Sequence, residues 1–188
     1  MRVLIGEDET LIRLDLRGML EAAGFEVCAE ARDGEEAVEL ARTEQPDLAV
    51  LDVKMPRLDG IETARRILDE RPIPIVIVSA YTEATLVERA AEAGVFGYLA
   101  KPFREEDLLP AIATARARFG QLAAVREQVD TLADALAARK AIERAKGILM
   151  AKQSLTEEAA FARLRKASQS SGRPMRVIAE AIIETFSR

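Results

Sequence analysis

The stretch Leu48-Ala49-Val50-Leu51-Asp52-Val53-Lys54-Met55-Pro56 decides the fold of roughly the first two thirds of this chain. Its four leading apolar residues predict a short buried strand, and a carboxylate follows directly. Strands that are apolar on both faces are typical of parallel sheets covered by helices on each side. We therefore expect an α/β domain with Asp52 at the carboxyl end of one strand.

Other short apolar runs repeat this pattern and alternate with amphipathic helical stretches. The expected strands are Val3–Ile5, Phe25–Ala29, Leu48–Leu51, Ile75–Val78 and Gly97–Leu99. The expected helices are Thr10–Ala23, Glu35–Thr43, Ile61–Glu70 and Thr85–Ala93, and a fifth begins near Glu105. Five βα units predict a doubly wound parallel sheet with flavodoxin-like topology.

The fifth helical pattern continues beyond the expected end of the α/β domain. Apolar residues recur from Leu108 to Leu136 at steps of three or four, a heptad-like pattern with one phase shift beside Gly120. We interpret this segment as a helical connector with coiled-coil character, and a surface helix lying on its own domain is the alternative. The expected domains are 1–118, a connector at 119–138 and a small helical domain at 139–188.

Residues 139–188 predict three helices. The first places Ile142, Ala145 and Leu149 on one face. Ser154 with Glu157 three residues later predicts a capping box at the start of the second helix. A turn at residues 170–174, which contains glycine and proline, precedes the last helix. The aromatic residues of this segment, Phe161 and Phe186, are expected on buried faces.

Charge and composition narrow the function classes. Residues 1–138 carry a net charge of −11 and residues 139–188 a net charge of +6, which suggests a second task involving a polyanion. The chain has no histidine, so histidine-based triads, histidine-ligated metals and histidine phosphotransfer within this polypeptide are excluded. With one cysteine, no signal-like N-terminus and no apolar run long enough to cross a bilayer, we expect a cytoplasmic protein without a membrane partner.

Polar residues follow the predicted strands at their carboxyl ends, where ligands bind in open parallel sheets. They are Glu7, Asp8, Asp52, Ser79 and Lys101. Clustered carboxylates repel one another unless a cation lies among them, and an oxygen-rich site of this kind suits Mg²⁺. One carboxylate, best placed at Asp52, can then attack a phosphoryl group while the cation and Lys101 neutralise the developing charge.

These residues, in this order, resemble the receiver domain of response regulators over residues 1 to about 118. The matching elements are Glu7-Asp8, Asp52-Val53-Lys54-Met55-Pro56, Asp59-Gly60, Ser79-Ala80 and Lys101-Pro102. The resemblance implies that a sensor histidine kinase phosphorylates Asp52. It also implies a switch protein rather than an enzyme, with slow self-dephosphorylation at most.

The resemblance further implies roles for individual residues. Glu7, Asp8 and Asp52 would hold Mg²⁺ together with the backbone carbonyl of Lys54. The family often has aspartate where this chain has Glu7, and the longer side chain fits direct or water-bridged contact equally. Ser79 and Lys101 would bind phosphoryl oxygens, and the Tyr98 ring would follow Ser79. Phosphorylation would reshape the face of the fourth and fifth helices and produce a homodimer.

The basic tail resembles the ANTAR family of RNA-binding antitermination modules over about residues 130–188. The matching stretches are 141–150, 157–161 and 164–168. The resemblance implies a three-helix domain that binds hairpin RNA, with four candidate contacts: Lys146, Arg165, Lys166 and Arg173. Because both aromatic residues are expected to be buried, recognition should rest on basic contacts and RNA shape, with strong salt dependence.

Three other readings compete with a phosphorylation-controlled RNA-binding antiterminator. A DNA-binding response regulator is the first, although the break at residues 151–155 lacks a clear glycine turn for a helix-turn-helix. A phosphohydrolase with Asp52 as nucleophile is the second, and Lys54 stands where such enzymes often have a general acid. A dimerising scaffold that binds only protein is the third.

Overall fold

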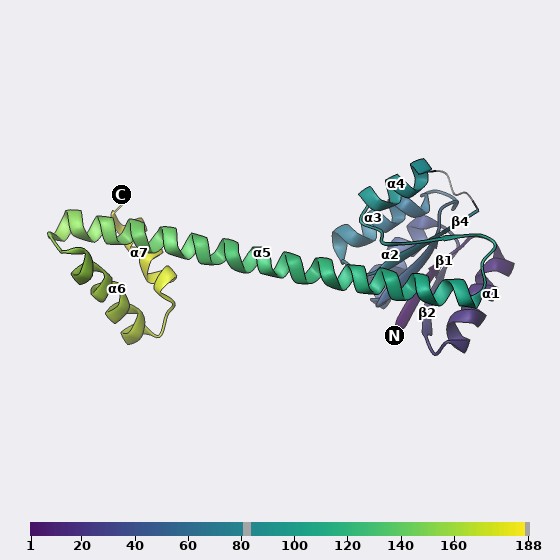
Figure 1. Ribbon diagram of the computed structural model, residues 1–188, viewed down its shortest axis with the longest axis horizontal. Coiled ribbons are helices and arrows are strands. Elements are labelled where there is room, and N and C mark those ends of the chain that lie inside the picture. Colours follow the sequence, from purple (N-terminus) through teal and green to yellow (C-terminus); the bar gives the residue numbers. More distant parts are fainter. Residues whose placement is uncertain (81–83, 187–188) are drawn as a thin grey trace. The chain divides into compact units, whose positions relative to one another are not determined.

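The computed structural model describes residues 1–80 and 84–186 (Figure 1). The chain forms two compact units, Met1–Ala123 and Ala124–Arg188. Among the described residues, no helix has both the length and the apolar character needed to span a membrane.

The first unit contains a five-stranded sheet. The strands are β1 (Arg2–Gly6), β2 (Glu26–Ala31), β3 (Leu48–Asp52), β4 (Ile75–Ser79) and β5 (Gly97–Ala100). All adjacent pairs are parallel, in the order β2-β1-β3-β4-β5. The predicted doubly wound, flavodoxin-like fold is therefore confirmed. Because the order reverses at β1, the carboxyl ends of β1 and β3 lie at the switch point where ligands bind.

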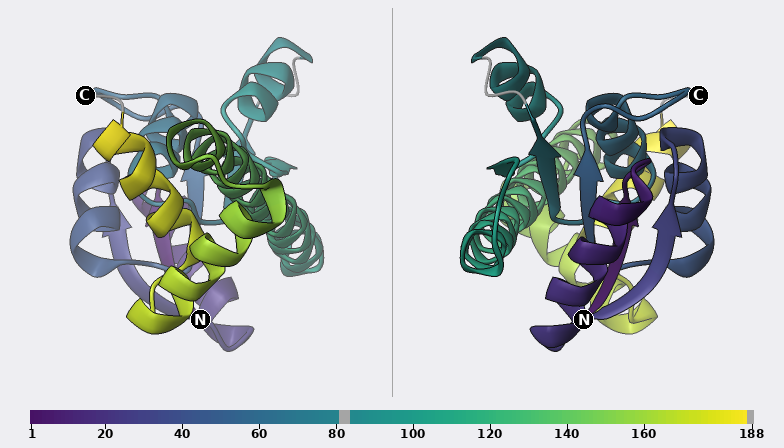
Figure 2. Two further views of the ribbon diagram at one scale, coloured as in Figure 1. Left: turned by 90° about the vertical axis from the view of Figure 1, so that its left-hand side faces the viewer. Right: turned by 90° about the vertical axis from the view of Figure 1, so that its right-hand side faces the viewer.

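Helices cover both faces of this sheet, as both views of Figure 2 show. The helices are α1 (Thr10–Ala22), α2 (Gly34–Glu44), α3 (Gly60–Glu70), α4 (Ala84–Glu92) and α5 (Glu105–Gln153). Side chains of β3 alternate between two cores: Leu48 and Val50 pack with α1 and α5, whereas Ala49 and Leu51 pack with α2, α3 and α4. This alternation explains why the strand sequence is apolar throughout.

The second unit consists of the end of α5 with α6 (Glu157–Ser171) and α7 (Met175–Phe186). Its small core contains Ala145, Leu149, Ala160, Leu164 and Ala179. Three helices were expected here, and Ala145 and Leu149 face inward as the periodicity predicted, whereas Phe161 and Phe186 do not. At this size the core is thin, so each contact between these helices counts heavily toward stability.

The predicted capping box at Ser154 is wrong. Thr156 is the N-cap of α6, and its side chain accepts a hydrogen bond from the backbone N–H of Ala159. Ser154 instead adopts a left-handed conformation with φ of 52° immediately after α5 ends. The short break between the helices contains two hydroxyl residues, Ser154 and Thr156. Ser154 takes part in the chain reversal after α5, so Thr156 is the one that caps α6.

The middle of α5 presents an apolar stripe to solvent. We call Val125, Val129, Leu132 and Leu136 the connector stripe; each is more than half exposed. Its members recur at steps of four, three and four, so they lie along one face of the helix. All four side chains are exposed, so the stripe is an apolar surface on this part of α5.

Candidate functional site

Residues from four strands meet at one rim of the sheet. Asp52 ends β3, Glu7 and Asp8 follow β1, Ser79 ends β4 and Lys101 follows β5. One carboxylate oxygen from each of Glu7, Asp8 and Asp52 lies within 4.8 Å of the other two. Glu7 and Asp52 are buried, with side chains 0% and 6% exposed, whereas Asp8 is exposed. The sheet order thus assembles an acidic pocket from residues far apart in sequence.

Lys101 joins the two buried acids. Its Nζ lies 2.5 Å from Oδ1 of Asp52 and 2.7 Å from Oε2 of Glu7. The backbone N–H of Lys101 also donates to the carbonyl of Ser79 at 2.7 Å, which ties the start of the loop after β5 to the end of β4. Contacts of both its side chain and its main chain therefore hold Lys101 beside the two acids.

The other oxygen of Asp52 is fixed by the following loop. The backbone N–H of Lys54 donates to Oδ2 of Asp52 at 2.7 Å. The start of α3 then returns against the strand, and a Cβ added to Gly60 would lie 1.9 Å from the carbonyl oxygen of Asp52. Only glycine permits this close approach of two backbone segments. Asp59, the preceding residue, caps α3 by accepting from the N–H of Glu62 at 2.8 Å.

Burial and charge have opposing effects on these groups. Burial raises the pKa of Glu7 and that of Asp52 above their ordinary values, while hydrogen bonds from Lys101 oppose the increase. Burial likewise disfavours the Lys101 ammonium, but its hydrogen bonds to Asp52 and Glu7 outweigh this and raise its pKa. Both carboxyls therefore carry a residual cost of ionisation that one ammonium does not remove.

The donor set fits a magnesium ion. Three carboxylates and one ammonium leave a formal charge of −2, which a divalent cation would neutralise. Opposite ligands of Mg²⁺ are separated by about 4.2 Å, since each bond is about 2.1 Å long. The three carboxylate oxygens lie within 4.8 Å of one another, which is close to this distance between opposite ligands. All the donors are oxygen, as Mg²⁺ prefers.

Ser79 and Tyr98 lie beside the pocket on β4 and β5. Ser79 is buried, with an exposed fraction of 1%. Tyr98 is half-buried and packs against the core cluster beneath α2, α3 and α4. In the parallel register Tyr98 is opposite Ile77, two residues before Ser79. The two side chains therefore belong to neighbouring strands.

The four expected RNA contacts occupy different surroundings in the second unit. Lys146 is buried, and its Nζ lies 3.0 Å from a carboxylate oxygen of Glu143 and 2.6 Å from one of Glu157. Arg165, Lys166 and Arg173 are exposed, and their side chains form no ion pair within residues 1–80 and 84–186. Of the four expected contacts, these last three are therefore the ones placed to meet a polyanion.

The expectation that both aromatic side chains of the tail are buried is wrong. Phe161 and Phe186 are 42% and 41% exposed. Phe161 lies one helical turn before Arg165 on α6, so an aromatic ring and a guanidinium share one face of that helix. The error arises because the small core holds only a narrow arc of α6, centred on Ala160 and Leu164.

Sequence reasoning missed Arg13, which contacts the loop that carries Glu7 and Asp8. Its guanidinium donates to the backbone carbonyls of Glu7 and Asp8. The available signal was its position three residues before Leu16 on the apolar face of α1, where an unpaired charge would be costly.

Comparison with known proteins agrees with this geometry. The family model for the response regulator receiver domain matches residues 3–113, and the model for the ANTAR domain matches residues 130–183. The chain belongs to the response-regulator family. This response regulator is 48% identical over 185 residues to the transcriptional regulatory protein PdtaR of Mycobacterium tuberculosis, which covers 98% of this chain and 90% of that protein. It therefore combines a receiver domain with an ANTAR domain.

Other similar proteins share only the receiver part. The transcriptional regulatory protein CseB of Streptomyces coelicolor is 40% identical over 118 residues, which cover 63% of this chain and half of CseB. The receiver domain of a diguanylate cyclase from Desulfovibrio desulfuricans has a TM-score of 0.59 at 36% identity, covering 64% of this response regulator and 96% of that chain. A Borrelia burgdorferi structure containing CheX, CheY, BeF₃ and magnesium has a TM-score of 0.58 at 27% identity. The match covers 60% of this response regulator and 86% of that chain.

Proposed function

We propose that a partner histidine kinase phosphorylates this response regulator on Asp52, and that the phosphoryl group controls hairpin-RNA binding and thereby transcription antitermination. The contact of Lys101 with both Asp52 and Glu7 is the observation that carries this proposal. It supports a pocket built to accept negative charge at Asp52. The acidic and basic halves of the chain support a division into a switch and an RNA-binding part. Both parts would act in the cytoplasm.

In the proposed transfer, an oxygen of Asp52 attacks phosphorus in a phosphohistidine of the kinase. The new bond joins that oxygen to phosphorus, the phosphorus–nitrogen bond breaks, and the histidine nitrogen keeps its electron pair. Lys101 stays within reach and neutralises charge on the phosphoryl oxygens. The backbone N–H of Lys54 orients the carboxylate through its hydrogen bond to Oδ2.

Mg²⁺ is the proposed cofactor of this step. Glu7, Asp8 and Asp52 would hold it with the backbone carbonyl of Lys54, and Glu7 would do so directly or through a water. When bound, the ion supplies charge neutralisation for the phosphoryl oxygens. The magnesium and BeF₃ present in the similar Borrelia burgdorferi complex support the choice of ion.

The phosphoryl group would act on Ser79 and Tyr98. Ser79 is buried at the end of β4, the strand next to Asp52, and its hydroxyl would bond a phosphoryl oxygen. Tyr98 would then shift inward on the neighbouring strand and change the face formed by α4, β5 and α5. This is a population shift between two states of one fold.

The change would pair two copies of the chain. We propose a receiver domain at residues 1–118, a connector at 119–138 and an RNA-binding domain at 139–188. The exposed connector stripe supports self-association, because pairing with the stripe of a second copy would remove its apolar side chains from water. RNA would then meet Arg165, Lys166 and Arg173. Lys146 would contribute only if it exchanged its carboxylate partners for RNA.

Phosphorylation of wild type and Asp52→Asn by acetyl phosphate with Mg²⁺, resolved on phosphate-binding gels, tests the acceptor. Asp69→Asn is the matched control, because Asp69 is exposed on α3 and lies outside the acidic pocket. Wild type and Asp69→Asn should give the retarded species and Asp52→Asn should not. A retarded Asp52→Asn species would assign the acceptor elsewhere.

The RNA proposal needs a separate test. Cellular RNA recovered on the full chain, with and without the BeF₃⁻ phosphoryl mimic, should contain a common hairpin class enriched in one state only. Direct titration should then show tighter binding to that hairpin than to duplex DNA of equal length. Tighter binding to the duplex would favour a DNA-binding regulator, and binding to neither would favour a protein scaffold.

A further inference from the structure

An arginine contacts the main chain of two residues of the acidic pocket. Arg13 is in the first turn of α1 and is 7% exposed. Helical side chains lean toward the N-terminus of their helix, so its guanidinium returns toward the loop between β1 and α1. Its Nη1 lies 2.6 Å from the carbonyl oxygen of Glu7 and 3.5 Å from that of Asp8.

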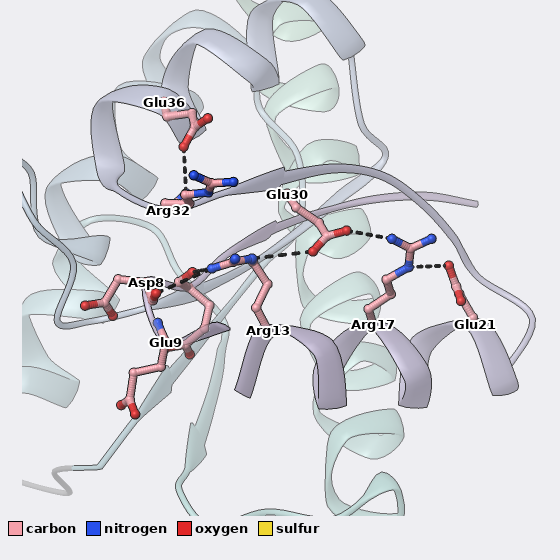
Figure 3. Close-up of polar contacts among 9 residues, drawn as sticks. Asp8, Glu9, Arg13, Arg17, Glu21, Glu30, Arg32 and Glu36 are labelled. Atoms are coloured by element: carbon pink, nitrogen blue, oxygen red, sulfur yellow. Dashed lines mark hydrogen bonds and ion pairs between the residues drawn. The ribbon is translucent and has the colours of Figure 1, made fainter. Parts of the chain in front are cut away.

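The guanidinium is itself held by a neighbouring strand. Nε of Arg13 lies 3.4 Å from Oε2 of Glu30 on β2. The other oxygen of Glu30 accepts from Arg17 at 2.9 Å, and Arg17 also pairs with Glu21 at 2.9 Å. Figure 3 shows these contacts as one chain along α1 that ends at the loop carrying Asp8. Arg13 is the member of this chain that contacts the loop.

The other contacts of the loop act mainly on Glu7, whose carboxylate accepts from Lys101 at 2.7 Å and from the backbone N–H of Glu9 at 3.3 Å. The backbone N–H of Glu7 donates to the carbonyl of Ala31 at 3.0 Å, which fixes the end of β1. Beyond that point Asp8 is exposed, and Glu9, the N-cap of α1, makes no side-chain capping bond. The two carbonyls that Arg13 binds belong to the residues whose carboxylates face Asp52. Arg13 therefore holds the main chain of both residues.

We infer that Arg13, oriented by Glu30, is a positioning residue that sets the divalent-cation affinity of the acidic pocket without contacting the cation. This inference rests on the proposed function, because it requires that Glu7, Asp8 and Asp52 bind Mg²⁺. Groups that hold metal ligands in place commonly change metal affinity by about 10- to 100-fold when they are removed.

Simple electrostatics predicts the opposite result for the same change. Removing a positive charge beside three carboxylates should tighten cation binding through the Coulomb term. Loss of positioning should weaken it, because the carboxylates must be ordered when the cation binds. The sign of the change in affinity therefore distinguishes a positioning role from a nearby charge.

The test is the dissociation constant for Mn²⁺ alone, measured on the full chain from the electron paramagnetic resonance signal of free Mn²⁺. Arg13→Met keeps the aliphatic stem and should raise the dissociation constant about tenfold. Arg13→Lys, which can reach one carbonyl, should fall between Arg13→Met and wild type. Arg17→Met is the matched control, since Arg17 contacts Glu30 but not the loop, and should stay within about twofold of wild type.

Glu30→Gln supplies a second variant that leaves the arginine in place. It should weaken Mn²⁺ binding in the wild-type background and have no effect in an Arg13→Met background, because the two residues act through one contact. At saturating Mg²⁺, acetyl phosphate should phosphorylate Arg13→Met at nearly the wild-type rate. If Arg13 were needed only for folding, its replacement would lower the melting temperature. Mn²⁺ affinity would then not follow the order wild type, Arg13→Lys, Arg13→Met, and Glu30→Gln would not lose its effect in the Arg13→Met background.

Failures of the two proposals have different signatures. Unchanged or tighter Mn²⁺ binding by Arg13→Met, with wild type binding normally and Glu7→Gln binding weakly, would overturn the positioning role alone. Absence of Mn²⁺ binding to wild type would overturn the metal site and the inference together.

Discussion

Lys101 and Asp52 are in contact, with Nζ 2.5 Å from Oδ1, although β4 separates the strands that carry them. The lysine also reaches Glu7 on the far side of Asp52. It spans the pocket because the loop after β5 is tied to Ser79 at the end of β4. A single ammonium therefore competes with any metal ion for the same two carboxylates.

Replacing Lys101 should separate metal binding from phosphoryl transfer. Lys101→Met removes the competing ammonium, so we expect tighter Mn²⁺ binding by titration. The same variant should be phosphorylated more slowly by acetyl phosphate, by about tenfold or more, because charge on the phosphoryl oxygens is no longer neutralised. Arg104→Met, an exposed cation in the same loop, is the control. Equal losses of metal affinity and rate would instead mean that Lys101 only supports the pocket.

The ion pair between Lys146 and Glu157 should stabilise the packing of α6 against α5. The hydrogen bond that Lys146 donates to Glu157 lowers the pKa of Glu157 and raises the pKa of Lys146. Protonating Glu157 therefore costs more in the folded state. The contribution should be present at neutral pH, lost as pH falls through the lowered pKa of Glu157, and lost at alkaline pH as Lys146 deprotonates.

Hydrogen exchange of α6 amides measures this directly. Glu157→Gln should accelerate exchange at neutral pH, and its difference from wild type should shrink in acid. Glu158→Gln is the neighbouring control, because Glu158 forms no ion pair within the described part of the chain. A difference that persisted at pH values well below the glutamate range would rule out the ion pair as its cause.

The connector stripe should mediate phosphorylation-dependent dimerisation. Leu132→Glu places a charge at the most exposed stripe position and should keep the chain monomeric in BeF₃⁻, as measured by sedimentation velocity. Thr131→Glu adds the same charge away from the stripe and should leave the dimer intact. If wild type has the same mass with and without BeF₃⁻, phosphorylation does not drive the association.

Arg165 and Lys166 should contribute to RNA affinity mainly through phosphates. Each change to glutamine should weaken hairpin binding at low salt and reduce the slope of log K against log salt by about 1. Arg118→Gln, an exposed cation of the first unit, should leave the slope unchanged. Hairpin binding by wild type that does not vary with salt would contradict this picture.

The exposed ring of Phe161 should stack on an unpaired RNA base. Phe161→Leu keeps an apolar side chain but removes the ring, so hairpin affinity should fall about tenfold, since base stacking on an aromatic residue is worth ~1–3 kcal/mol. Phe161→Tyr should retain wild-type affinity. If leucine and tyrosine bind equally well, the ring serves packing instead.

Much of the fold of the first unit could be predicted from local sequence patterns. The apolar run before Asp52 and the alternation of strands and helices were enough for the sheet, because each pattern reports how one element is buried. Helix starts were harder: Asp33 caps α2 by accepting from the N–H of Glu36, so the helix begins one residue before the predicted start at Glu35. At Thr156 the choice among neighbouring capping residues depended on how α5 ends.

Sequence alone determined the order of Glu7, Asp8, Asp52, Ser79 and Lys101 along the strands and the uneven distribution of charge. Tertiary structure decided which of these groups touch, because contact depends on strand order and on loops from distant elements. It placed Arg13 against the main chain of Glu7, paired Lys146 with two glutamates and left Phe161 partly exposed. Periodicity reports the face of a helix on which a residue lies, and only the packed neighbours decide whether that face is covered.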